Sequence, residues 1–104
     1  MAWFILFIAG LSEVAWAVGL KYTEGFSRPL SSVVTLLFLV ASFLLLGLSL
    51  RSLPLGLAYG IWVGIGALGT AIAGIILFGE QLSTLKLVSL GFIVLGIVGM
   101  KLSA

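Results

Sequence analysis

Glu13 is the residue with the clearest chemical potential, because it lies inside a long apolar run, in the segment GLSEVAWAVGL at residues 10–20. A lone acidic side chain near the centre of a bilayer costs on the order of 2.5 to 3.5 kcal/mol to insert. Desolvation favours the neutral form of a carboxyl group, whereas a bound cation compensates its charged form. A protonated acid that only hydrogen-bonds between helices is the structural alternative, although glutamine would do this at lower cost. The position therefore predicts a site where a proton and a cation exchange.

Aromatic and hydroxyl side chains accompany this carboxylate in three apolar runs. Trp16 follows Glu13 by about one helical turn and lies too deep for the interfacial aromatic belt, so its indole N–H needs a buried partner or a ligand. Ser42 is the middle one of three hydroxyls spaced seven residues apart, and it either lines a pocket or bonds back to its own helix. Tyr59 and Trp62 are one turn apart and border a groove, unless Tyr59 is an ordinary belt residue.

Glycines form two further patterns. Gly64 and Gly66 flank a single residue in the third apolar run, where they predict a bend or hinge because glycine weakens a helix. Gly96 and Gly99 share one side of the fourth run with Ser89. A stripe of small residues is typical of a seam where helices pack or chains dimerise. These glycines therefore concern movement and packing rather than direct contact with a ligand.

Four apolar runs must position these residues. They cover residues 2–20, 32–50, 57–78 and 87–102. Each is close to the ~20 residues that a helix needs to cross ~30 Å of hydrocarbon. Hydrophobic residues make up 62% of the chain and charged residues only 8%, a balance far outside the range of soluble domains. We therefore predict an all-α integral membrane protein in which residues 1–104 form a single domain with four transmembrane helices.

The composition also excludes several classes of chemistry. The chain contains no cysteine, histidine, aspartate or asparagine, so disulfides, thiol chemistry and the usual His or Cys metal sites are ruled out. The connections are too short to hold a catalytic site of their own, and few groups capable of bond cleavage are present. The net charge of +2 is too small and dispersed to indicate nucleic acid. We expect no enzyme activity, no metal or other cofactor and no nucleic-acid partner.

Positive charges are almost evenly divided between the two sides of the predicted bundle. Arg51 and Lys101 lie on the N-terminal side, and the opposite side holds three basic residues, Lys21, Arg28 and Lys86. Because Lys and Arg normally mark cytoplasmic loops, this balance permits insertion in both orientations. Four helices are also too few to enclose a substrate and two gates, which many transporters obtain from inverted repeats. We therefore hypothesise an antiparallel, dual-topology homodimer.

Four short spans, a mid-membrane glutamate in the first and a YxxW in the third resemble the small multidrug resistance (SMR) family of proton-coupled exporters. The resemblance covers essentially the whole chain. Within the family, three segments are similar to the guanidinium exporter (Gdx) branch, namely GLSEVAWAVGLKYTEGFSR, SLPLGLAYGIWVGIG and the ending GIVGMKLS. Members of this branch carry Trp16 and Lys101, where the polyaromatic-cation branch usually has glycine and asparagine.

The resemblance implies a multi-pass protein of the bacterial inner (plasma) membrane, surrounded by lipid, that exports guanidinium and small guanidinyl cations in exchange for protons. It also implies an antiparallel dimer in which Glu13 of both copies shares one site. The other side chains that the resemblance places there are Trp16, Ser42, Tyr59 and Trp62. Two alternatives stay open: an exporter of quaternary ammonium or polyaromatic cations, and a non-transporting membrane subunit in which Glu13 pairs with a basic residue of a partner helix.

Overall fold

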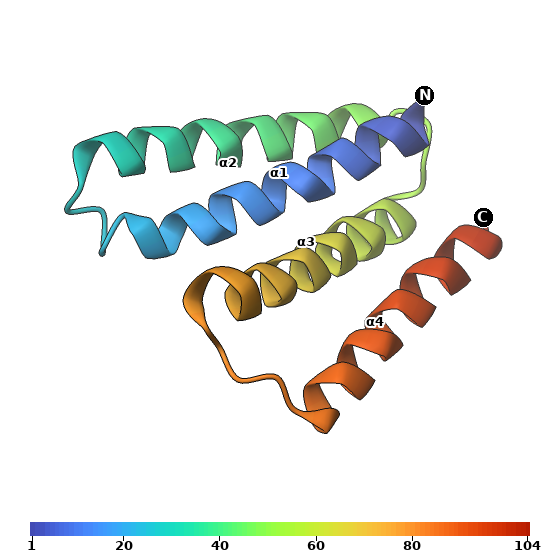
Figure 1. Ribbon diagram of the computed structural model, residues 1–104. Helices are drawn as coiled ribbons and strands as arrows, with labels where there is room; N and C mark the ends of the chain where they lie inside the picture. Colours follow the sequence, from blue (N-terminus) through green and yellow to red (C-terminus); the bar gives the residue numbers. More distant parts are fainter.

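The computed structural model describes residues 1–104, which form four α-helices joined by three short connections (Figure 1). The helices are α1 (Ala2–Tyr22), α2 (Pro29–Ser49), α3 (Leu55–Phe78) and α4 (Thr84–Leu102). All four are long and apolar enough to cross a membrane. A helix suits such a span because it satisfies its own backbone N–H and C=O groups where no water is present. The predicted all-α fold with four long apolar helices is confirmed.

Each helix extends beyond its predicted apolar run at one end, and α2 ends at Ser49, one residue before its run does. Pro29 is the first residue of α2, a position where its missing N–H is no loss. Ser83 caps α4, and its hydroxyl accepts a hydrogen bond from Lys86 N at 3.2 Å. Gly79 ends α3 with a φ of 65°, and its N–H bonds to Gly74 O. Capping chemistry rather than hydropathy therefore sets these helix ends.

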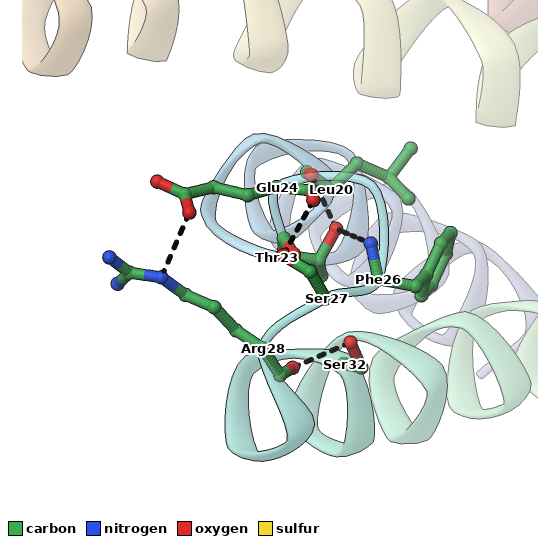
Figure 2. Close-up of polar contacts among 7 residues, drawn as sticks. All are labelled: Leu20, Thr23, Glu24, Phe26, Ser27, Arg28 and Ser32. Carbon is green, nitrogen blue, oxygen red and sulfur yellow. Dashed lines mark hydrogen bonds and ion pairs between the residues drawn. The ribbon is translucent and has the colours of Figure 1, made fainter.

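The turn between α1 and α2 is held by hydrogen bonds around the buried Thr23 (Figure 2). The Thr23 hydroxyl donates to Leu20 O at 2.7 Å and accepts from Phe26 N at 3.2 Å. Glu24 and Phe26 adopt positive φ angles of 48° and 64°, which reverse the chain within a few residues. Arg28 Nε donates to Glu24 Oε2 at 3.3 Å, and this is the single ion pair of the chain. The turn thus fixes α2 antiparallel to α1.

The helices form a flat layer rather than a closed bundle. The principal extents of the molecule are 41 × 35 × 17 Å, and the shortest is less than two helix diameters of about 10–12 Å each. Helix α1 packs against both α2 and α3, α2 also touches α3, and α4 packs against α3 (Figure 1). Both termini lie at the same end of the layer.

A small apolar core lies where α1, α2 and α3 meet. Its buried members are Leu6, Ala9, Leu46, Ala58, Ile61 and Trp62. Helix α4 contributes no buried residue. Many large side chains are exposed on the outer faces, among them Leu37 on α2 and Leu95 on α4. Exposed apolar faces of this extent suit a hydrocarbon surrounding.

Glycines bring α1 and α3 into close contact. A Cβ atom placed on Gly10 would lie 2.6 Å from Ile65 Cγ2 and 2.8 Å from Ile65 Cβ. A Cβ atom on Gly69 would overlap Val14 in the same way. Because helix interfaces are close-packed, a methyl group at either position would displace the neighbouring side chain or push the two helices apart. The α1–α3 spacing therefore depends on glycine at both positions.

We expect Gly10→Ala to lower the free energy of unfolding by about 1–3 kcal/mol, because the added methyl group overlaps Ile65. Gly47→Ala is the matched control, since no atom lies within 4 Å of a Cβ placed there. Alanine favours a helix over glycine, so this control should be at least as stable as the wild type. Thermal unfolding in detergent, followed by circular dichroism, measures both midpoints. Equal midpoints for the two variants would contradict the close packing of α1 on α3.

Candidate functional site

Glu13 projects from α1 onto the backbone of α3 at Gly66. A Cβ atom on Gly66 would overlap the Glu13 carboxyl group, so glycine is the residue that leaves room for this side chain. Glu13 Oε1 is buried and has no hydrogen-bond partner. An unsatisfied polar atom is costly in an apolar surrounding. This carboxyl group is therefore available to a proton, a ligand or another chain.

Trp16 is the second residue with an unsatisfied buried polar atom. Its Nε1 has no acceptor, although a buried indole N–H usually finds one. Trp16 follows Glu13 by three residues, close to one turn of α1. Glu13 Oε1 and Trp16 Nε1 are the only buried side-chain nitrogen or oxygen atoms without a partner. One acceptor and one donor thus lie unused about one turn apart on the same helix.

A hydrogen-bond chain links Trp62, Ser42 and Ala9 across three helices. Trp62 Nε1 on α3 donates to Ser42 Oγ on α2 at 2.9 Å, and Ser42 donates to Ala9 O on α1 at 2.8 Å. Ser42 is completely buried, and Trp62 is 3% exposed. Of the two interpretations of Ser42, the structure excludes a bond back to its own helix. Because a hydroxyl has one proton to donate, Ser42 has none left for Glu13 in this arrangement.

Aromatic rings extend this chain toward the open face of the layer. The Tyr59 ring centroid lies 5.6 Å from that of Trp62, and Tyr59 is 52% exposed. Phe43 of α2 also packs against Trp62, and the centroids of the two rings lie 5.2 Å apart. Both pairs are tilted, an arrangement that aromatic quadrupoles favour. Phe43 was not predicted from the sequence, because it resembles any other apolar residue of its span.

The structure therefore brings Ser42, Tyr59 and Trp62 into one cluster and places Glu13 and Trp16 beside it. Ala9 links the two parts, because it accepts the Ser42 hydrogen bond and precedes Glu13 by four residues, one turn of α1. Sequence reasoning missed this carbonyl, since a backbone acceptor looks the same at every residue. The Ser42 cluster therefore meets α1 at Ala9, one turn before Glu13 on the same helix face.

The two glycines predicted as a hinge lie within the continuous helix α3. Each has a neighbour that occupies the space of its missing Cβ. A Cβ on Gly64 would lie 2.8 Å from Ile97 Cγ1 of α4, and one on Gly66 would overlap Glu13. Close packing thus gives both glycines a structural reason, and their role as a hinge stays a prediction.

Gly96 and Gly99 lie on a part of α4 that no other helix covers. No atom lies within 4 Å of a Cβ placed on either residue. Near the end of α4, Lys101 Nζ lies 5.4 Å from the centroid of the Trp3 ring, a cation–π contact with the start of α1. The small-residue side of α4 is therefore open, and its role in dimer packing stays a prediction.

Similarity to known proteins extends along the whole chain. The model of the Small Multidrug Resistance protein family matches residues 1–93. The chain belongs to the small multidrug resistance family. The guanidinium exporter of Salmonella typhimurium is 59% identical over 104 residues, which cover 100% of this chain and 99% of that protein. The guanidinium exporter of Yersinia pestis is 56% identical over 104 residues and 100% of both chains. That of Escherichia coli K12 is 57% identical over 103 residues, 99% of this chain and 98% of the relative.

These findings confirm the family resemblance that the motifs predict. The names of the family and of its members describe transporters and not enzymes. Together with four membrane-spanning helices, they make this small multidrug resistance protein a multi-pass protein of the bacterial inner membrane. These three relatives carry the guanidinium exporter name, in agreement with the predicted branch of the family.

We expect Ser42→Ala to lower the free energy of unfolding by about 1–3 kcal/mol, because it leaves the buried Trp62 Nε1 without its acceptor and removes the hydrogen bond from α2 to Ala9 O. Ser89→Ala is the matched control, because the Ser89 hydroxyl is exposed and bonds only to Leu85 O of its own helix. The control should change stability by less than about 0.5 kcal/mol. Unfolding in detergent, followed by tryptophan fluorescence, compares the two. Equal losses would mean that the hydrogen-bond chain between helices contributes nothing.

Proposed function

We propose that this protein is a proton-coupled antiporter that exports guanidinium and small guanidinyl cations. The observation that carries the proposal is the Glu13 carboxyl group, which is packed on Gly66 inside a membrane-spanning helix and has a buried oxygen without a partner. The names of relatives that are 56–59% identical support guanidinium as the substrate class. A carboxyl group is the one side chain of the site that can bind either a proton or a cation.

Guanidinium matches this site by shape and by charge. Its planar N–H groups can form two parallel hydrogen bonds to a carboxylate, a geometry that a quaternary ion cannot reproduce. The ring of Trp16 can stack on the same cation, a contact worth around 2 kcal/mol when water is excluded. Trp62 is nearly buried and holds Ser42, so its predicted contact with substrate requires a shift of α3. Tyr59 stands at the open edge, where it would limit the pocket to small cations.

A second copy of the chain completes the site in this proposal. One layer of helices leaves Glu13 without a lid, and α4 presents an uncovered side at Gly96 and Gly99. We assign this side of α4 to the dimer seam. The balanced positive charges permit the two copies to insert in opposite directions, which supplies the inverted repeat of many transporters. Glu13 of each copy then faces the same central space.

Coupling follows from competition for these two carboxylates. An empty site would hold two negative charges in a poorly solvated space, which is costly, so a dimer without a ligand changes its open side slowly. A proton or guanidinium removes this cost. Only a loaded dimer then alternates, and the bend at Gly64 and Gly66 lets α3 move between the two states. A proton gradient thereby drives the cation outward.

Purified protein in liposomes with an imposed proton gradient tests the function directly. We expect gradient-driven uptake of guanidinium, and little uptake of a bulky quaternary ammonium ion under the same conditions. Equal or better transport of the quaternary ion would instead favour a polyaromatic-cation exporter. Failure to move either ion would favour a non-transporting subunit. One experiment therefore separates the three functional classes.

Glu13→Gln should reduce gradient-driven guanidinium uptake to the level of empty liposomes. The amide has the size of the acid but binds neither a proton nor a cation by charge. Glu24→Gln is the matched control, because Glu24 is exposed in the α1–α2 turn and pairs with Arg28 (Figure 2). The control should transport like the wild type. Robust coupled uptake by the Glu13 variant would refute the exchange scheme.

Trp16→Gly is expected to shift selectivity toward larger cations. Loss of the indole removes a stacking surface for guanidinium and opens space one turn from Glu13. The ratio of guanidinium to bulky-cation transport should fall by roughly tenfold, within the range that a desolvated cation–π contact supports. Competition between the two ions in the liposome assay measures this ratio. An unchanged profile would place Trp16 in helix packing instead.

A further inference from the structure

A groove of about 430 Å³ opens between α1 and α3 on the side of the Glu13 site that leads to the α1–α2 and α3–α4 turns. It begins one helical turn beyond the site, because Ala17 follows Glu13 by four residues and Thr70 follows Gly66 by four. Its floor consists of small residues, and its outer end is formed by Lys21, Phe78 and Glu80. The groove therefore runs from the membrane surface toward the intramembrane carboxylate.

Glu80 is the acidic residue at the mouth of this groove. Its carboxyl group folds back onto α3, where a Cβ on Gly74 would overlap it. It borders both the groove and an adjoining pocket of about 310 Å³ that Lys86 also lines. The single ion pair of the chain joins Arg28 to Glu24, so Glu80 has no ion-pair partner. The carboxylate thus faces two cavities without a direct ion pair.

The two lysines that line these cavities are directed elsewhere. Lys21 Nζ lies 4.8 Å from the centroid of the Phe78 ring, in a cation–π contact. Lys86 Nζ donates a hydrogen bond to Gln81 O at 2.6 Å. Each lysine therefore has its own contact and forms no ion pair with Glu80. The oxygens of the Glu80 carboxylate can accept hydrogen bonds from a further N–H donor.

We propose that Glu80 forms an outer cation site, where a guanidinium-type cation binds before it moves along the groove to Glu13. The inference rests on the proposed function and names a second carboxylate for the same substrate. The paired N–H groups of guanidinium suit the Glu80 carboxylate as they suit Glu13. Between the two acids, the Thr70 hydroxyl offers an acceptor for an N–H group on the way. The outer site raises the capture of substrate, while Glu13 performs the exchange.

Initial rates of guanidinium uptake into proteoliposomes, measured over a range of concentrations, test the outer site. We expect Glu80→Gln to raise KM about two- to fivefold at an unchanged maximal rate, the range that an exposed ion pair supports. Glu80→Asp keeps the charge and should restore most of the affinity. Glu24→Gln is the matched control, because it removes an acid that lies on the same side of the chain but already has a cation partner.

Salt separates capture by charge from a structural role of Glu80. The KM difference between Glu80→Gln and the wild type should shrink at about 0.5 M salt, because salt screens an exposed charge. A lower maximal rate at unchanged KM, or a KM difference that persists in salt, would overturn the outer site. Equal KM values for the Glu80→Gln and Glu24→Gln variants would also overturn the outer site, but they would not contradict the proposed function of the wild type. No guanidinium uptake by the wild type would instead refute the proposed function.

Discussion

Every polar group in the spans of this chain needs a partner, because hydrocarbon offers none, and the rest of the structure depends on how this requirement is met. Trp62, Ser42 and Ala9 meet it among themselves and thereby join three helices. Glu13 and Trp16 do not. The same α1 helix thus carries a satisfied, structural part and an unsatisfied part about one turn further on. The first part holds α1, α2 and α3 together next to the second.

Close approach of α1 and α3 makes this division possible. Gly10, Gly66 and Gly69 remove the side chains that would otherwise separate the two helices. With a larger spacing, Glu13 would extend into lipid, where neither a proton nor a cation could be exchanged with water. With the spacing as observed, the carboxyl group rests on the backbone of α3 at Gly66. The close packing of the two helices and the position of Glu13 therefore depend on the same contact between α1 and α3.

The four helices could be predicted from hydropathy alone, because each span is apolar and almost free of charge. The helix ends could not, since Pro29 and Ser83 start their helices in polar stretches that carry no hydropathy signal. Glu13 stood out because its insertion is costly. The partner of Ser42 was invisible, because the Ala9 carbonyl is a backbone group. Gly66 was predicted as part of a hinge, whereas its contact with Glu13 depends on how two distant helices meet.

In the proposed scheme, two carboxylates in different surroundings bind the cation one after the other. Glu80 is exposed and can attract a hydrated cation from solution, but it binds weakly because water competes. Glu13 lies deeper and binds more strongly because its surroundings are less polar, but a cation reaches it only after losing water. The groove between them lets this dehydration proceed in steps, with Thr70 as an intermediate hydrogen-bond partner. Lys21, held on Phe78, borders the same path. In this scheme the cation first binds weakly at Glu80 and then tightly at Glu13. The inner site can therefore be selective and still fill quickly.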